Sequence, residues 1–476
     1  MRKARRVIRL AFYAVMAACI AEPTHGQDEN PTEGRPVPER PLPLFNRWQE
    51  DWSVLADDRV PRQPGDDLKY ISLSATDPPA YLSLGANLRE RFEAFDAAQF
   101  GTGPNRNDDY VLSRFEVHSD LRLGPHLQIF VQLQSAFAFG KEIRTPVDQN
   151  RLDLEQAFMA ITDSIAGGTL TLRAGRQQVA FDLQRFISVR DGTNVRQSYD
   201  ATWIEYERGD WHFIALWSHP VQTRDNSPFD DYSSPSLSHA GVKLEWQVSA
   251  ATSVSATWSR FIQDAAHFPQ ASGKESRDSL DTHCAGARDN FDWDIEAMGQ
   301  KGHIDSQNIR AWAFGSLGGY TLTALPWTPR LGLQVDTASG DRVSDDHTFG
   351  TFNPLFPNGA YFSLSGLTGY ANLVHAKTSV TVHPTRNLKI NLAAAAQWRQ
   401  TTTDAIYTAP DIPVASTIGH GGGRFTGKYG QLHLERELSS NATVSMEALH
   451  FAAGDAIKKA GGRDSNYLAV EIRLMW

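Results

Sequence analysis

The sequence predicts an all-β fold, a transmembrane antiparallel up-and-down β-barrel of about 18 strands with short periplasmic turns and long extracellular loops. Segments of about ten residues alternate between apolar and polar side chains, and turn signals separate these segments. The first residues have the pattern of a secretory signal. No apolar run beyond residue 21 is long enough for a transmembrane helix, and the mean hydropathy is -0.40. The sequence therefore excludes a helical membrane protein.

The beginning of the chain predicts export. Basic side chains between Arg2 and Arg9 precede an apolar stretch, Leu10 to Ala21, that is too short to span a bilayer. We predict residues 1–26 as a signal peptide and the bacterial outer membrane as the location. The formal net charge of -9 becomes more negative once this basic segment is removed, which argues against a nucleic-acid partner. Cys284 is the only cysteine beyond residue 26, so neither an intrachain disulfide nor a cysteine metal site is expected.

Residues 27–79 form a proline-rich N-terminal periplasmic leader. The sequence leaves two alternatives open for it, a disordered tether or a segment that packs into the barrel mouth. A short helix is expected around Arg47 to Leu55.

Residues 80–476 are predicted to form the barrel, and the stretch from Tyr81 to Phe95 shows the pattern most clearly. Its apolar face consists of Leu82, Leu84, Ala86 and Leu88, and its polar face of Ser83, Gly85, Asn87, Arg89, Arg91 and Glu93. In a membrane barrel the apolar face contacts lipid and the polar face lines the lumen. We therefore expect Arg89 and Arg91 in water inside a pore.

About seventeen strands can be identified, and an even number is expected, so we predict eighteen. The doubtful region is Ile309 to Ser339. Long loops are expected at Asp96 to Asp109, Pro220 to Leu237, Asp264 to Asp289, Gly340 to Tyr370 and Thr401 to Thr426. The last strand, Tyr467 to Trp476, ends on an aromatic residue and resembles the signal of barrels inserted by the outer-membrane barrel assembly machinery, which is an expected partner.

Several stretches together resemble the alginate export family of outer-membrane barrels. They are Glu50–Ser53 with Asp67–Ile71, Tyr81–Gly85 with Arg89–Arg91, Leu152–Phe158, Ala174–Gln177, Ser188–Gly192, Asn194–Arg196, Tyr199–Asp200, Ser339–Arg342 and Thr351–Pro357. This resemblance implies an 18-stranded barrel that passes a secreted polyanionic polysaccharide through an arginine-rich constriction. The expected partners are outer-membrane lipid, the anionic polysaccharide and, as a further candidate, periplasmic secretion components.

A conduit for a uronate polymer needs fixed cations along its path, and arginine suits carboxylates because its planar fork stays charged. The candidates for the lumen are Arg89, Arg91, Glu93, Arg114, Arg122, Arg151, Asp153, Glu155 and Arg173. We expect that exchanging Arg89 and Arg91 for glutamate lowers anion preference without preventing assembly.

The most concentrated basic region surrounds Phe181 to Asn194 and supplies the candidate constriction. Its arginines are Arg176, Arg185, Arg190 and Arg196. The alternative is that they pair with Asp182, Asp191 and Asp200 and only hold an inward loop. Arg176 falls on the apolar face of its strand, so we expect it at the strand end or beyond a bulge, because arginine at mid-bilayer is costly.

Tryptophans on the strands are interpreted as lipid-facing or interfacial anchors. These residues are Trp203, Trp211, Trp217, Trp246, Trp258, Trp312 and Trp398.

Three alternatives to a polysaccharide conduit were considered. An enzyme is disfavoured, because the histidines are scattered and neither H-E-x-x-H nor G-x-S-x-G occurs. We predict no catalytic residue, no metal ligand and no cofactor. A porin that prefers small anions and a structural barrel closed by its own loops use the same fold and stay open as alternatives.

Overall fold

The computed structural model describes residues 37–74, 80–103, 107–343, 346–418 and 422–476. The predicted signal peptide lies outside the described residues, as do residues 27–36 and 75–79 of the leader.

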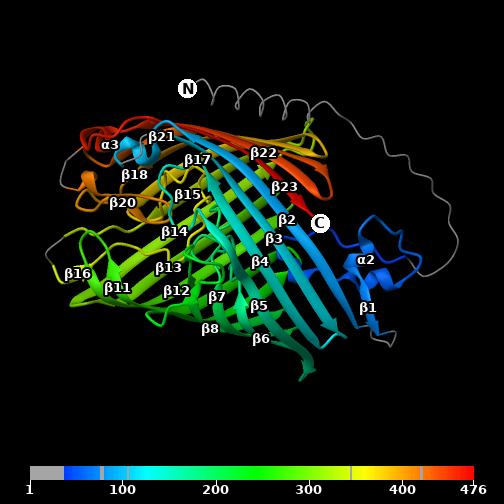
Figure 1. Ribbon diagram of the computed structural model, residues 1–476. Coiled ribbons are helices and arrows are strands. Elements are labelled where there is room, and N and C mark those ends of the chain that lie inside the picture. The colour runs from blue at the N-terminus through cyan, green and yellow to red at the C-terminus, as the bar shows by residue number, and fades with distance from the viewer. Residues whose placement is uncertain (1–36, 75–79, 104–106, 344–345, 419–421) are drawn as a thin grey trace.

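Among the described residues, eighteen antiparallel strands form one closed barrel, which confirms the predicted fold (Figure 1). These strands are β2 (Ala80–Phe95), β3 (Asp108–Leu123), β4 (Leu127–Phe139), β5 (Asn150–Ile165), β6 (Gly168–Gln177), β7 (Tyr199–Arg208), β8 (Trp211–Gln222), β10 (Leu237–Ser249), β11 (Thr252–His267), β12 (Ser272–Arg288), β13 (Phe291–Ile304), β14 (Gln307–Thr321), β15 (Arg330–Ala338), β17 (Leu373–Thr385), β18 (Leu388–Trp398), β21 (Phe425–Ser439), β22 (Ala442–Ala453) and β23 (Ser465–Met475). Each strand pairs with the next along the chain, and β2 pairs with β23 to close the ring. Closure leaves no unpaired sheet edge in the bilayer.

The remaining elements are short and lie in the connections and the leader. They are the 3-10 helices η1 (Arg47–Gln49), η2 (Trp52–Ala56), η3 (Ala98–Gly101) and η4 (Ala415–Thr417), the helices α2 (Asp66–Lys69) and α3 (Asp455–Lys459), and the strands β1 (Ile71–Ser74), β9 (Tyr232–Ser233), β16 (Thr348–Phe349), β19 (Ile406–Thr408) and β20 (Ile412–Val414). Within the part of the chain that the structure describes, no helix is both long and apolar enough to cross a membrane.

The predicted loop from Asp264 to Asp289 is wrong, because most of it is strand β12. The outward face of β12 lacks the apolar pattern of the other strands. Asp278 lies opposite Arg260 of β11, and the two side chains form a bidentate ion pair with bonds of 2.8 and 2.9 Å. The doubtful region Ile309 to Ser339 forms one hairpin, in which residues 322–329 connect β14 to β15.

Trp203 is a second correction. The sequence predicts a lipid-facing or interfacial anchor at this position, yet the side chain is only 7% exposed. It lies on the same face of β7 as the buried Tyr199, stacks on Phe181 and donates a hydrogen bond to Glu205. By contrast, Trp211, Trp217, Trp246, Trp258 and Trp312 are exposed.

Residues 37–74 pack into the periplasmic mouth of the barrel, near the end of β23 (Figure 1). Arg47 is buried and donates hydrogen bonds to Asn87 of β2 and to the carbonyl oxygen of Trp476. Strand β1 pairs with the beginning of β2, before the residues of β2 that pair with β23. Of the two alternatives for the leader, these contacts match packing into the mouth.

Candidate functional site

The segment between β6 and β7, residues 178–198, folds into the lumen, and we call it the inward loop. Asn194 of this loop donates hydrogen bonds to the carbonyl oxygens of Ser113, Phe137 and Asp148, on or beside β3, β4 and β5. The amide is buried, and a buried amide without such partners would be costly. The inward loop is therefore fixed against the inner wall.

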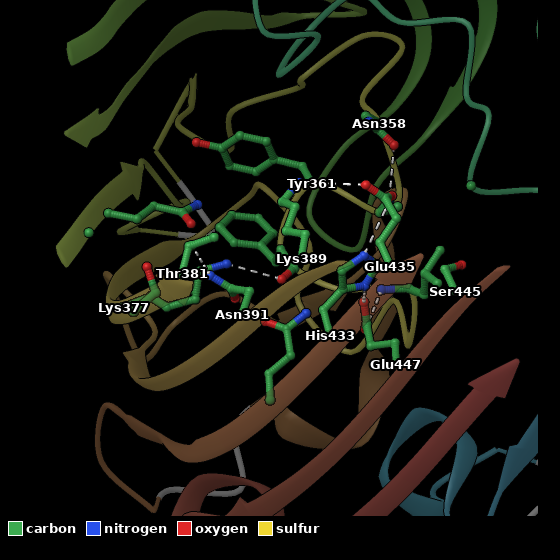
Figure 2. Close-up of a pocket in the computed structure, with 18 of the residues that line it drawn as sticks. Asn358, Tyr361, Lys377, Thr381, Lys389, Asn391, His433, Glu435, Ser445 and Glu447 are labelled. Atoms are coloured by element: carbon green, nitrogen blue, oxygen red, sulfur yellow. Dashed lines mark hydrogen bonds and ion pairs between the residues drawn. The ribbon is translucent and has the colours of Figure 1, made fainter. Parts of the chain in front are cut away.

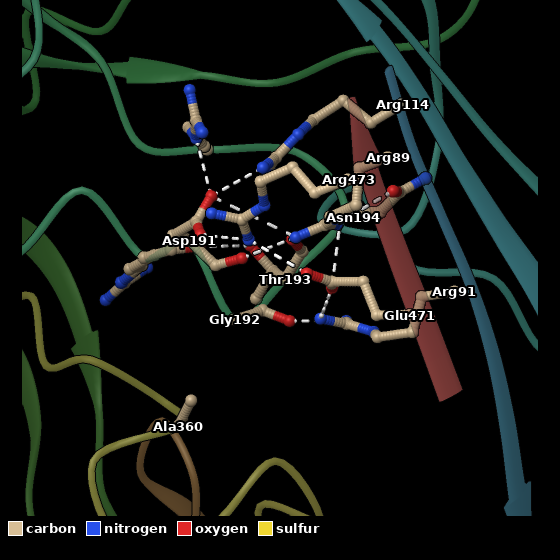
Figure 3. A network of polar contacts seen from close by, with 12 residues as sticks. Arg89, Arg91, Arg114, Asp191, Gly192, Thr193, Asn194, Ala360, Glu471 and Arg473 are labelled. Carbon is tan, nitrogen blue, oxygen red and sulfur yellow. Dashed lines mark hydrogen bonds and ion pairs between the residues drawn. The ribbon is translucent and has the colours of Figure 1, made fainter. Parts of the chain in front are cut away.

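Arg89 and Arg91 bind this loop from β2 (Figure 3). Arg89 donates to the carbonyl oxygens of Asp191 and Thr193 at 2.7 and 2.8 Å, and Arg91 donates to that of Gly192 at 2.6 Å. Their side chains are only 2% and 3% exposed. The expectation that both lie in water is wrong, because the loop, which is about a hundred residues away in sequence, covers them. The predicted Glu93 pairs with Arg91 at 2.6 Å.

Asp191 lies at the centre of a cluster of guanidinium groups (Figure 3). Its carboxylate accepts from Arg114 at 2.5 Å, Arg196 at 2.8 Å and Arg473 at 3.1 Å. Burial alone would raise the pKa of the Asp191 carboxyl group, but these guanidinium groups outweigh burial and hold it well below its ordinary value. This ion cluster holds the tip of the inward loop.

The other predicted lumen residues fall into separate groups. Arg122 donates to the carbonyl oxygens of Trp48 and Glu50, and Arg173 lies over the ring of Trp48, so both contact the leader. Asp153 and Glu155 are buried on the lumen side of β5. Arg151 is 59% exposed and pairs with Asp225, because a register shift between β4 and β5 interrupts the alternation beside it.

The predicted constriction residues do not form one ring. Arg176 lies one residue before the end of β6, where it pairs with Asp200 at 2.9 Å. Arg185 pairs with Asp294 and Glu296 of β13 at 2.5 and 2.9 Å.

Arg190 and Arg196 differ in their partners. Arg196 binds Glu116 of β3 at 3.0 Å in addition to Asp191. Arg190 donates to the carbonyl oxygen of Leu355 at 3.3 Å, and among the described residues it has no carboxylate within 4.0 Å. Arg185 and Arg196 therefore anchor the inward loop to different sides of the wall, while Arg190 contacts Leu355 and lies over the ring of Phe356.

A cavity of about 660 Å³ occupies the periplasmic half of the lumen, and we call it the inner cavity (Figure 2). Its wall comes from the periplasmic ends of β15, β17, β18, β21, β22 and β23. Of the described residues that line it, the cationic ones are Arg91, Arg330, Lys377, Lys389 and Arg473, and the acidic ones are Asp191, Glu435, Glu447 and Glu471. Basic groups therefore exceed acidic groups by a small margin.

The sequence prediction missed most of these basic residues. Lys389 is 46% exposed, and its nearest carboxylate, that of Glu435, lies 3.9 Å away. Arg473 stands on the face of β23 opposite Leu468 and Leu474, so the alternation of that strand could have identified it.

A second cavity of about 210 Å³, the outer cavity, lies toward the extracellular ends of β2 and β3. Arg190, Lys141 and Glu93 are among the residues that line it.

Arg91, Gly192, Ala360 and Leu364 line both cavities, and we call this group the septum. Ala360 and Leu364 come from the long loop 339–372. A Cβ atom added to Gly192 would lie 2.9 Å from the Cβ of Ala360, so the two loops touch at this point (Figure 3). The two cavities thus meet at a contact between two loops beside Arg91.

Groups of carboxylates that could hold a metal occur outside the septum. In the group of Asp182, Asp281 and Glu296, the charge of Asp182 is already compensated by Lys243 and that of Glu296 by Arg185. A second group contains Asp153, Asp230 and Asp231.

Comparisons with known proteins agree with the barrel. The fold is similar to OpdO of Pseudomonas aeruginosa, with 11% identity over 83% of this chain and 97% of that chain and a TM-score of 0.54. It is also similar to OccAB1 of Acinetobacter baumannii, with 12% identity over 86% of this chain and 99% of that chain and a TM-score of 0.55. At these identities the likeness shows the fold. No curated protein sequence matches the chain. The alginate export family matches residues 80–471, so the chain belongs to this family of outer-membrane channels.

Proposed function

We propose that the protein conducts an anionic polysaccharide or oligosaccharide, of the alginate-like polyuronate class, from the inner cavity past the septum to the outer cavity. The observation that carries this proposal is the position of Arg91, which borders both cavities at their common boundary. Once the two loops part, a carboxylate passing from one cavity to the other would pass beside this guanidinium group, which pairs with Glu93 and Glu471 in the closed structure. Family membership supports the same class of substrate.

The charge balance of the inner cavity suits transport rather than tight binding. A conducting site must attract its ion and also release it. Arg473 pairs with Glu471 at 3.0 Å, and Arg330 pairs with Asp292 at 2.8 Å, so acidic neighbours moderate both fields. Lys389 has the weaker partner and offers an exposed ammonium group to a passing carboxylate.

Conduction requires the septum to open. Gly192 and Ala360 are in contact, while Arg91 holds Gly192 through its carbonyl oxygen. Movement of either loop, the one that carries Gly192 or the one that carries Ala360, would separate these two residues. The septum is therefore the gate in this proposal.

A porin for small anions is the second candidate. The observation that favours it is the size of the inner cavity, about 660 Å³, which is the range of a small-molecule site. The ion pairs of Arg473 and Arg330 in the inner cavity would moderate the attraction of a small anion in the same way as that of a polyuronate.

Single-channel conductance in a planar bilayer tests the proposal. The refolded protein is measured in a salt gradient, and then with oligouronates or with neutral oligosaccharides of the same length. We expect anion selectivity and a concentration-dependent block by the oligouronates alone. Large conductance without block would favour the porin, and equal block by both sugars would contradict recognition of the carboxylates.

Lys389→Gln supplies the matched variant, because its side chain faces the inner cavity and makes one distant ion pair. We expect weaker block by oligouronates and lower anion preference. Arg260→Gln is the control, since it removes the same charge from an ion pair on the outward face of β11. Equal effects of the two substitutions would exclude the inner cavity as the path.

A further inference from the structure

The extracellular connection between β8 and β10, residues 223–236, meets β5 at a cluster of carboxylates. Asp230 and Asp231 of this connection face Asp153 of β5, and one oxygen from each lies within 4.8 Å of the others. Such crowding of like charges is unfavourable unless a cation or hydrogen-bond donors compensate it.

Hydrogen bonds compensate the cluster only in part. Asp231 accepts from the backbone nitrogen of Arg224 at 2.7 Å and from Asn150 at 2.9 Å. Asp153 accepts from the backbone nitrogens of Leu154 at 2.7 Å and Asp231 at 3.0 Å. Asp230 uses one oxygen for two backbone nitrogens, at 3.0 and 3.1 Å. Its other oxygen, Oδ1, is buried and has no hydrogen-bond partner in the described structure.

The nearest guanidinium group neutralises the cluster only in part. Arg176 lies 3.7 Å from Asp153, but its bidentate partner is Asp200, with bonds of 2.9 and 3.1 Å. Arg176 is therefore already paired with a different carboxylate, and the cluster keeps an excess of negative charge.

Two buried amide side chains supply an independent observation. Gln134 and Asn150 are 4% and 3% exposed. Their carbonyl oxygens, Oε1 and Oδ1, are buried without a hydrogen-bond partner among the described residues. Both side chains line a cavity of about 10 Å³ together with Asp153, Glu155 and Asp231. Arg196 also lines this cavity, but its guanidinium group pairs with Glu116 at 3.0 Å and Asp191 at 2.8 Å. This volume is about that of one water-sized sphere, so the cavity can hold a single water or ion.

We propose that this cavity and the adjoining cluster bind one Ca²⁺ ion. The unsatisfied groups are all oxygens, from carboxylates and amides, which are the ligands that Ca²⁺ prefers. Calcium to oxygen distances of about 2.3–2.6 Å place opposite ligands about 5 Å apart, and the three carboxylate oxygens fit within that span. A water molecule could donate to two of these oxygens but would leave the excess negative charge in place.

The ion would join three separate parts of the chain. Asp153 belongs to β5, Asp230 and Asp231 to the extracellular connection, and Val195 and Ser198 of the inward loop line the same cavity. Bound Ca²⁺ would therefore fix the extracellular connection to the wall beside the end of the inward loop. The sequence prediction of no metal ligand did not consider this set, because Asp153 and Asp230 are far apart in the chain.

The test is calorimetric titration of the chelator-treated, refolded full-length protein with Ca²⁺ alone, in detergent free of lipopolysaccharide. We expect one saturable site with a Kd in the range of extracellular calcium modules, about 10⁻⁴ to 10⁻³ M. Mg²⁺ should bind at least about tenfold more weakly, because it keeps several waters that the small cavity excludes. No saturation by about 10 mM Ca²⁺, or equal binding of Mg²⁺, would overturn the proposal.

Variants assign the binding to these residues. Asp230→Asn and Asp231→Asn should each weaken Ca²⁺ binding at least about tenfold, because each removes a charged ligand. Asp264→Asn is the matched control, since Asp264 is an exposed carboxylate near another extracellular connection. Gln134→Glu should tighten binding by adding a charged ligand, and misfolding would not produce such a gain. Unchanged affinity in all three cluster variants would overturn the assignment.

Discussion

Asp191→Asn tests whether the arginine cluster around Asp191 holds the inward loop in place. The substitution removes one negative charge and keeps the shape of the side chain. The carboxylate accepts hydrogen bonds from Arg114, Arg196 and Arg473. Removing one partner from a buried ion pair costs about 3–5 kcal/mol. Water reaches this carboxylate, whose side chain is 23% exposed, so we take about 3 kcal/mol as the loss for the docked inward loop.

Because about 1.4 kcal/mol corresponds to a factor of ten, the released state of the inward loop should become about 100-fold more populated. The septum contains Gly192, the next residue, so we expect more frequent channel openings and stronger anion preference. Barrel pairing is untouched, and the heat-modifiable gel migration of the folded barrel should therefore persist.

The assay is single-channel recording in a salt gradient, which gives opening frequency and reversal potential together. Asp278→Asn serves as the control, because it removes a carboxylate from an ion pair on the outward face of the barrel. A folded Asp191→Asn protein with the opening frequency and selectivity of the parent would refute the argument that this carboxylate holds the gate.

Three further predictions concern the lumen and the leader. Arg190→Gln should lower anion preference in bilayer recordings, because Arg190 lines the outer cavity and has no carboxylate partner within 4.0 Å among the described residues; unchanged selectivity would contradict this. Burial lowers the pKa of Lys69 from 10.5 to about 8. Between pH 8 and 10.5, Lys69 is therefore protonated in the undocked leader and neutral in the docked leader. Docking of the leader should strengthen as the pH rises through this window. Protease protection of residues 37–74 should rise across that window, and Lys69→Met should abolish the trend; a fall in protection would refute it. Gly65→Ala should expose the leader to protease, because Gly65 has φ +94° and an added Cβ would lie 2.4 Å from Nε1 of Trp476, whereas Gly209→Ala, also at positive φ but with open space around it, should not.

The alternation of the strands could be predicted because lipid and water impose opposite demands on neighbouring residues. Leu88 and Arg89 of β2 illustrate this, since one points outward and the other inward. Strand β12 escaped prediction because an ion pair, Arg260 with Asp278, replaces apolar side chains on its outward face. A pattern of single residues cannot reveal a pair of charges that compensate each other across two strands.

The candidate site was only partly predictable. The alternation of β2 predicted that Arg89 and Arg91 point into the lumen. It could not predict their partners, because Asp191 and Gly192 are about a hundred residues away in sequence and contact them only in the folded barrel. Whether a lumen arginine is free or bound depends on such distant contacts. Arg190 and Arg185 stand five residues apart in the same loop, and yet one lacks a carboxylate partner in the described structure while the other has two.

The position of Arg47 has a consequence for the attachment of the leader. Its guanidinium group binds Asn87 of the first barrel strand and the carbonyl oxygen of Trp476, directly after the last one. Those two acceptors come together only when β2 has paired with β23. The contacts of Arg47 with both acceptors therefore require a closed barrel, so a barrel that opened between these two strands would lose this attachment of the leader.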